Sequence, residues 1–207
     1  MMIQPIVEGQ GDEAAVPVLL RRLRDEARAW GLDVGRPHRR RRTQLVKKDS
    51  LQMAVRVAAL REDCAGILIL FDADDDCPKE LAPTIEEWAR DAAGGKPCAV
   101  VLANREYEAW FLSSIEALRG KSAILHEAMS HPDPEGPRDA KGELEQRMRH
   151  GASYSPTVDQ AALTAHLDLE SAHRRCRSFR RLVSAFGALA ASAGVAPAVW
   201  PPEKWVS

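Results

Sequence analysis

The sequence lacks the long apolar runs and the secretory features that mark membrane and exported proteins. In its 207 residues no apolar run approaches the roughly 20 residues that span a bilayer. The segment from Met1 to Glu8 has no basic region followed by a long apolar stretch, so no secretory signal is expected. These absences predict a cytoplasmic protein without a membrane partner.

Closely spaced metal-binding cysteines and histidines are also missing. Four cysteines occur, at Cys64, Cys77, Cys98 and Cys176. No two of them form a C-x-x-C zinc element, and their spacing indicates no disulfide framework. The best candidates for a helical pair of histidines are His166 and His173, which would lie on one helix face but two turns apart. We therefore expect reduced thiols and no zinc site built from cysteine and histidine.

The chain has almost no net charge, yet its basic residues are unevenly distributed. The formal net charge of −1 favours no partner. Basic side chains are dense over residues 36–48 and again over 174–181, and such local patches can bind phosphate backbones. The second patch favours a solvated helix face. The first fits either a solvated loop or a nucleic-acid contact through Arg39, Arg40, Arg41, Arg42 and Lys47.

Short apolar runs alternate with amphipathic stretches in the first half of the chain. Residues 66–71 and 98–103 are continuously apolar, and residues 2–7 are apolar except for Gln4, which is typical of strands covered on both faces. Residues 32–43 predict a weaker strand. Helical periodicity covers residues 14–30, 50–61 with Val57 facing inward, 81–93 and 105–118. This alternation predicts an α/β core over residues 1–118, with a mainly parallel sheet and helices on both faces.

The second half predicts a mostly helical extension of the same single domain, over residues 119–207. Helices are expected over 140–149 and 163–193. The proline-rich tail from Pro197 to Ser207 is expected to dock through Trp200 or Trp205. The chain shows no internal repeat and no low-complexity segment.

Acidic residues follow three of the predicted strands. Glu8 and Asp12 follow the first, and a run from Asp72 to Asp76 follows the strand at 66–71. Glu106 and Glu108 follow the last strand. Because parallel strands bring their carboxyl ends to one edge, these acids should converge there.

The spacing of Asp72 and Asp74 predicts a shared cation. Side chains two residues apart in an extended backbone point to the same side, and paired carboxylates repel unless a cation lies between them. A carboxylate-only site favours Mg²⁺ or Mn²⁺. The alternative is helix capping, which we favour for Asp75 and Asp76 and consider for Asp12.

Two further acids have open roles. Glu106 could reach the site from the start of a helix, whereas Glu108 could be a solvated acid of the first helical turn. Our candidate catalytic residues are thus Glu8, Asp72, Asp74 and Glu106, and the candidate metal ligands are Glu8, Asp12, Asp72 and Asp74.

These motifs carry a family resemblance. Val7-Glu8-Gly9 followed by Asp12 resembles the first motif of Toprim domains, and Phe71-Asp72-Ala73-Asp74 resembles their Asp-x-Asp motif. The chain also resembles an uncharacterised bacterial family of small Toprim-like proteins over residues 3–186, including segments 105–112, 154–160 and 176–179. Toprim domains occur in topoisomerases, primases and the overcoming-lysogenization-defect nucleases.

The resemblance implies a Toprim-like fold and a metal-dependent site of nuclease or nucleotidyl-transfer type that acts on nucleic acid, either DNA, which we favour, or RNA. Glu8 and Asp72 would then hold one metal, Asp74 would support the same or a second one, and Glu106 would be a lesser ligand or general base. Small proteins of this kind are often paired with an ABC- or SMC-type ATPase in phage defence. Asp12 replaces the family's usual Glu, Arg105 replaces a histidine, and Lys141 corresponds only loosely to a basic family position.

Two other functions stay open. A Toprim-like module can bind nucleic acid or a protein partner without cutting, although such modules usually lose the acids that are present here. The Asp-x-Asp motif would also permit a phosphatase-like enzyme or a phosphotransferase that acts on a small substrate, but the sequence has no glycine-rich phosphate loop with its lysine.

Overall fold

The computed structural model describes residues 1–195 and 199–206 and contains one sheet of five strands. All pairings in this sheet are parallel, and the strand order is β2-β1-β4-β5, with β3 also pairing with β1. The predicted α/β class, with a mainly parallel sheet flanked by helices, is confirmed and is consistent with a Toprim-like fold. The strands are β1 (Met2–Val7), β2 (Asp33–Val34), β3 (His38–Arg39), β4 (Cys64–Asp72) and β5 (Cys98–Ala103).

The three predicted apolar runs form the three long strands, β1, β4 and β5, as predicted. The expected strand over 32–43 is wrong as a single element, because only β2 and β3 form there, each two residues long. Gly35 and Pro37 separate them. A side chain at Gly35 would lie 2.6 Å from Met2 Sδ, and proline has no amide hydrogen for a ladder. The chain therefore passes close to β1 without extending the sheet.

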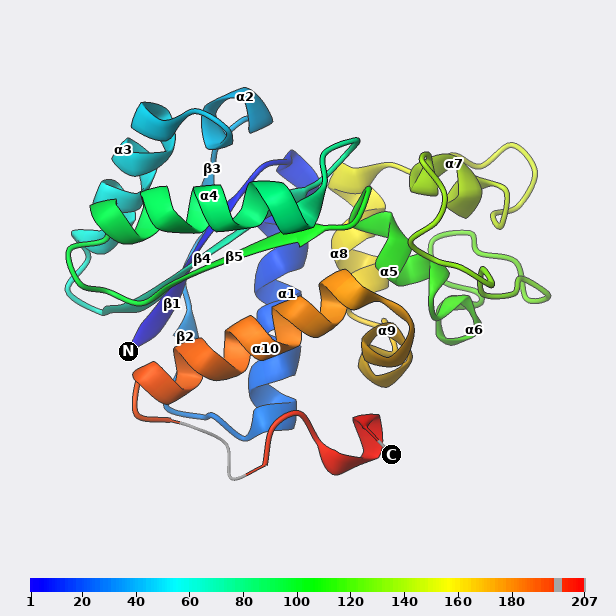
Figure 1. Cartoon of the computed structure of the whole chain (residues 1–207). Coiled ribbons are helices and arrows are strands. Elements are labelled where there is room, and N and C mark those ends of the chain that lie inside the picture. Colours follow the sequence, from blue (N-terminus) through cyan, green and yellow to red (C-terminus); the bar gives the residue numbers. More distant parts are fainter. Residues whose placement is uncertain (196–198, 207) are drawn as a thin grey trace.

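Helices cover both faces of the sheet (Figure 1). The short α2 (Arg42–Leu45), α3 (Lys48–Ala59) and α4 (Pro78–Ala92) pack on one face and share an apolar core with it. On the other face lie α1 (Gln10–Ala27) and α10 (Arg177–Ser192). Alternate residues of each strand enter these two cores. Val57, expected to face inward, is instead 43% exposed.

The second half contains helices separated by long loops, and its helices are shorter than predicted. The segment 105–118 divides into α5 and α6 at Ser113 and Ser114, where the Ser113 hydroxyl donates to Trp110 O and the Ser130 hydroxyl accepts the Ile115 N–H. The segment 163–193 divides because the Glu135 carboxylate caps the start of α10 at the N–H of Arg177 and Ser178. The elements are α5 (Glu108–Leu112), α6 (Ile115–Leu118), α7 (Ala140–Glu145), the π-helix η1 (Pro156–Gln160), α8 (Ala161–Thr164) and α9 (Leu169–Arg175).

The C-terminal tail docks through both expected tryptophans. Trp205, in the 3₁₀-helix η2 (Glu203–Trp205), is buried, and the Trp200 indole donates to Val183 O at 2.7 Å. The tail positions 196–198 and 207 lie outside the described residues.

One apolar cluster runs from Ile3 to Trp205, so the helical extension packs on the α/β core. Among the described residues, no helix is both long and apolar enough to cross a membrane.

The first turn of α1 depends on a glycine. A Cβ at Gly11 would lie 2.1 Å from Gln160 Oε1 and 2.7 Å from Pro156 O. We expect Gly11→Ala to lower the free energy of unfolding by about 1–3 kcal/mol through overpacking, as measured by chemical denaturation. Gln10→Ala, at the neighbouring exposed position, should change it by less than about 0.5 kcal/mol. Equal stability of the two variants would contradict close packing between α1 and η1.

Candidate active site at the carboxyl edge of the sheet

A cavity of about 420 Å³ opens beyond the carboxyl ends of β1 and β4. This is the edge at which open α/β sheets bind ligands. The cavity is bounded by the turn after β1, the last residue of β4, the segment after β5, and residues from α7 and η1. Its lining residues are Glu8, Gly9, Gln10, Gly11, Asp12, Asp72, Tyr107, Glu108, Lys141, Ser155, Pro156, Thr157 and Gln160.

Asp72, the last residue of β4, places its carboxylate in this cavity. Its Oδ1 accepts the Tyr107 N–H at 2.9 Å, and its Oδ2 lies 3.9 Å from Lys141 Nζ. Burial raises the pKa of Asp72 well above its usual range, and the neighbouring Glu108 and Asp12 raise it further. The folded protein thus holds Asp72 where its ionised form needs a cation.

Glu8 follows β1 directly and also lines the cavity. Its Oε2 atom is buried and has no hydrogen-bond partner among the described residues. Burial raises the pKa of Glu8, Asp74 raises it further, and Arg42 opposes both effects. An unpaired buried carboxylate oxygen is costly, so this atom is available to a cation or a donor that enters the cavity.

Asp12 is not the N-cap of α1. The helix begins at Gln10 with Gly9 as its N-cap, and Asp12 occupies the third helical position. Its Oδ2 accepts the Gly9 N–H at 2.8 Å, while its Oδ1 accepts from Gln160 Nε2 at 2.7 Å. Both carboxylate oxygens therefore have donors. Asp12 joins the turn after β1, at Gly9–Gly11, which we call the glycine turn, to η1.

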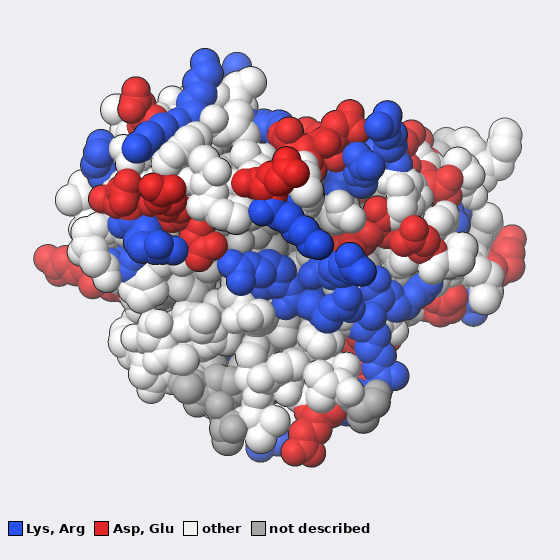
Figure 2. Space-filling model, viewed as in Figure 1, with Lys and Arg blue, Asp and Glu red and all other residues white. Residues whose placement is uncertain are grey.

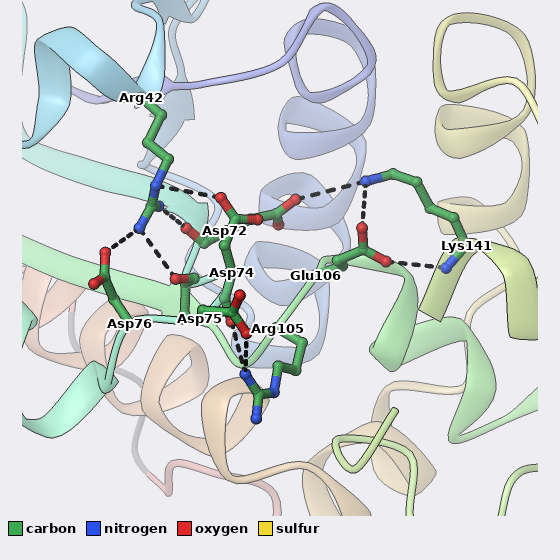
Figure 3. Close-up of polar contacts among 9 residues, drawn as sticks. Arg42, Asp72, Asp74, Asp75, Asp76, Arg105, Glu106 and Lys141 are labelled. Atoms are coloured by element: carbon green, nitrogen blue, oxygen red, sulfur yellow. Dashed lines mark hydrogen bonds and ion pairs between the residues drawn. The ribbon is translucent and has the colours of Figure 1, made fainter. Parts of the chain in front are cut away.

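Lys141 is the cation of the cavity. Its Nζ lies 2.9 Å from Glu106 Oε1, 3.7 Å from Glu108 Oε2 and 3.9 Å from Asp72 Oδ2. The Lys141 N–H also donates to Glu106 Oε2 at 3.0 Å, so both oxygens of Glu106 bind this lysine (Figure 3). Burial opposes the charge of Lys141, but the three carboxylates outweigh it and raise the pKa of Lys141.

Glu108 is not a solvated helix-start acid. Its side chain lies inside the fold, with the residue only 1% exposed, and its Oε2 has no hydrogen-bond partner among the described residues. Burial raises the pKa of Glu108, and Lys141 opposes this shift. Tyr154 and Lys141 both lie close enough to lower the pKa of Glu108, so the buried cavity oxygen without a nearby donor is that of Glu8.

Asp74 is not a lining residue of the cavity, unlike Asp72. Its φ of 51° is left-handed, so the extended geometry that would align the two carboxylates ends at Asp72. The Arg42 Nε lies 3.2 Å from Asp74 Oδ2, and the same guanidinium contacts Asp76 and the backbone carbonyl of Asp72 (Figure 3). The cation beside Asp74 is therefore a protein guanidinium.

The two acids after Asp74 do not cap α4. The N-cap of that helix is Cys77, and it has no side-chain cap. Asp75 instead pairs with Arg105 at 3.0 Å, and Asp76 pairs with Arg42. Ion pairs with neighbouring loops therefore replace the expected caps.

The first basic stretch lies beside the glycine turn because β3 pairs with the end of β1. Arg39 is opposite Val7 and its Nε lies 3.0 Å from Glu13 Oε2. Arg41 and Lys47 are exposed, and Arg40 donates to the carbonyl of Arg39. The guanidinium of Arg42, the first residue of α2, contacts the loop after β4. Of the five predicted nucleic-acid contacts, the structure leaves Arg40, Arg41 and Lys47 without ion pairs among the described residues.

The described part of the chain contains no group of three Asp, Glu, His or Cys residues arranged to hold a metal ion. The donor chemistry still fits Mg²⁺ or Mn²⁺. These ions prefer oxygen ligands, and Mg²⁺ usually retains several waters and binds through one or two carboxylates. Glu8 and Asp72, with raised pKa values and one unpaired buried oxygen on Glu8, are such donors.

Sequence reasoning missed part of this site. Glu108 follows the same strand as Glu106, so its position was visible in the sequence but its burial was not. Lys141 was indicated only by a loose family correspondence. Gln160 is 148 residues from its partner Asp12, and no local pattern in the sequence signals that contact.

A family model described as a domain of unknown function (DUF4276) matches residues 7–186. The matched region extends from the end of β1 into α10 and contains every residue that lines the cavity. No curated protein and no solved structure matches the chain.

We expect Asp72→Asn to stabilise the protein in the absence of divalent cations at neutral pH. The raised pKa values of Asp72, Glu8 and Glu108 mean that folding favours their protonated forms. The resulting stability is complete below about pH 4 and is lost as the pH rises through the raised pKa values. Asparagine cannot ionise, and its Oδ1 can still accept the Tyr107 N–H.

Thermal melts in EDTA test this expectation. Asp72→Asn should melt about 2–4 °C above wild type near neutral pH, as about 1 kcal/mol would produce, and the difference should disappear near pH 4. The exposed Asp91→Asn is the control. A lower melting temperature for Asp72→Asn at neutral pH would show that the ionised Asp72 carboxylate does not destabilise the folded protein.

Lys141→Met should have the opposite effect. It removes the cation nearest to Asp72, Glu106 and Glu108 and leaves buried acceptors unsatisfied, at a cost of about 1–3 kcal/mol. The loss should shrink as the pH falls and the carboxylates become protonated. Chemical denaturation across this pH range gives the measurement, with Lys121→Met as the matched exposed control. A loss of unfolding free energy that does not change with pH would show that Lys141 does not stabilise the fold by compensating the charge of these carboxylates.

Proposed function

This chain belongs to the DUF4276 family, and we propose that it is a divalent-metal-dependent enzyme that cleaves phosphodiester bonds in nucleic acid. The observation that carries the proposal is the cavity at the carboxyl edge of the sheet, in which Glu8, Asp72 and Glu108 meet Lys141. Clustered acids with raised pKa values in a cleft are typical of catalytic sites. The resemblance of the surrounding motifs to Toprim domains supports the same chemistry.

In this proposal Glu8 and Asp72 hold Mg²⁺ or Mn²⁺, and Asp12 contributes through water. A divalent ion in such a site polarises a phosphoryl oxygen and lowers the pKa of a bound water. Asp74 supports the site from outside the cavity: it raises the pKa of Glu8, while its partner Arg42 lowers it. Arg42 thus tunes Glu8 in addition to ordering the loop after β4.

The protein's own residues supply the remaining contacts. The Lys141 ammonium faces the cavity and can contact a phosphate oxygen, while Glu106 orients it through both carboxylate oxygens. Glu108, with a raised pKa, can hold a proton at Oε2 and release it near a reacting oxygen. Ser155 and Thr157 place hydroxyl groups on the opposite wall.

The substrate and partners follow from the family resemblance. We propose DNA as the substrate, contacted through Arg40, Arg41 and Lys47, and an ABC- or SMC-type ATPase as the partner in a phage-defence system. The four cysteines are free thiols, which favours a reducing compartment such as the cytoplasm.

A second function is a Toprim-like module that binds nucleic acid or a protein without cutting. One observation favours it: Lys141 already lies among Asp72, Glu106 and Glu108, so part of the acidic charge is neutralised by the protein itself. The two functions differ in whether divalent ions bind and whether phosphodiesters are cleaved.

The test is cleavage of plasmid DNA and of RNA with Mg²⁺ or Mn²⁺, with the protein alone and with any ATPase encoded beside it. Glu8→Ala and Asp72→Asn should each reduce cleavage by more than the ~10–100-fold that loss of an outer-shell residue causes. Because Asp72→Asn is expected to be more stable than wild type, unfolding cannot explain its inactivity. Asp91→Asn should cleave normally.

A melting temperature measured with increasing Mg²⁺ provides a readout that does not depend on activity. Wild type should be stabilised by the ion and Asp72→Asn should not, since ligand binding stabilises only the state that binds it. Equal cleavage by wild type and Asp72→Asn would reject the catalytic assignment. Salt-sensitive DNA binding without cleavage under any condition would establish the binding module instead.

A further inference from the structure

A second and larger hollow lies along the free edge of the sheet. Its volume is about 560 Å³, and it is formed between α4 and α10 beside β5, the last strand in the sheet order. Its floor is apolar: Ala82 and Pro83 of α4 line it, together with Val100 and Leu102 of β5, of which Val100 is fully buried and Leu102 is 3% exposed. We call this hollow the β5 groove. Its volume is in the range of small-molecule and cofactor pockets.

The rim of the β5 groove is basic. Lys79, Arg177 and Arg181 line it, together with Glu86, which pairs with Arg181 at 3.1 Å. Among the described residues, the side chains of Lys79 and Arg177 have no ion pair or hydrogen bond. Figure 2 shows lysine and arginine side chains gathered in a continuous band over the beginning of α10. The groove therefore combines an apolar floor with free positive charge at its rim.

The β5 groove and the active-site cavity are joined by one short segment. Asn104, directly after β5, lines the groove, and Glu108 lines the cavity. Four residues span at most about 14 Å of chain. The strand order places β5 on one side of the acids that follow β1 and β4, and β3 with Arg39 on the other side. A linear anionic polymer crossing the cavity would reach the groove on one side.

We propose that the β5 groove binds an unpaired nucleotide next to the scissile phosphate, with its base on the apolar floor and its phosphates on Lys79, Arg177 and Arg181. This inference rests on the proposed function and names its substrate class as single-stranded or locally unpaired nucleic acid. Charge complementarity selects this occupant, because a nucleotide combines a flat, weakly polar base with a negative charge at each phosphate.

The chemistry of the groove residues suits a base. Guanidinium planes stack on bases as well as binding phosphates, and Arg177 is free to do either. The Asn104 amide donates one N–H to Glu135 O at 3.4 Å and keeps its Oδ1 acceptor and second N–H for a base edge. A base that is paired within a duplex is stacked between its neighbours and cannot enter a hollow beside β5. Binding in the groove therefore requires the base to be unpaired.

The test is binding of a short fluorescein-labelled oligothymidylate, followed by fluorescence anisotropy in EDTA, where no metal-dependent cleavage occurs. The double variant Lys79→Glu with Arg177→Glu should bind at least about tenfold more weakly, and its salt dependence should fall by about 0.7 per lost phosphate contact. The control, Arg21→Glu with Lys121→Glu, has the same charge change at exposed positions outside the groove and should bind as wild type does.

A second variant tests the apolar floor. Ala82→Trp should fill the hollow and weaken oligothymidylate binding without changing its salt dependence, and wild type should bind the single strand more tightly than the matching duplex. Two results would each overturn the proposal: equal affinities of the groove and control charge variants, or binding that neither Ala82→Trp nor duplex formation changes. The latter would indicate contact with phosphates alone.

These measurements are independent of the cleavage test. If wild type binds the oligonucleotide through the groove but cleaves nothing with any metal, the proposed enzyme is rejected and the groove assignment stands. If wild type cleaves DNA and loses cleavage with Asp72→Asn, yet the groove variants bind normally, the enzyme stands and the groove assignment is rejected.

Discussion

The site depends on one constraint: a parallel sheet brings acids together at its carboxyl edge, and the fold must then compensate their charge. Burial raises the pKa values of Glu8, Asp72 and Glu108, and neighbouring carboxylates raise each of them further. Two cations compensate this negative charge. Lys141 lies inside the cavity beside Asp72, and Arg42 lies outside it beside Asp74. Such a site stores unfavourable charge that an incoming cation can relieve, at some cost in stability without it.

The helical extension completes this arrangement. Lys141 comes from α7, and η1 closes the cavity over the glycine turn, with Gln160 bound to Asp12. The close approach of Gly11 to Pro156 and Gln160 joins the two halves of the chain at the site itself. The α/β core supplies the acids, and the extension supplies their principal cation and the opposite wall.

The arginines have two distinct roles. Arg42 and Arg105 neutralise the acids of the loop after β4 and are parts of the fold. Arg177 and Lys79 have no such partner among the described residues, and they lie over an apolar floor beside the edge strand. Local density of basic residues along the chain does not separate these roles, because the distinction depends on whether a carboxylate from another segment lies within reach.

The sequence by itself determined the α/β class, the three long strands and the acids that follow them, because apolar runs and strand-end positions are local features. Only the tertiary structure decided which acids enter the cavity. The left-handed backbone at Asp74 and the guanidinium of Arg42 separate Asp74 from Asp72. Glu108 is buried, Lys141 lies beside it, and Gln160 contacts Asp12. Each of these contacts joins segments that are distant along the chain. Such contacts depend on how the helices pack, which no local spacing of residues encodes.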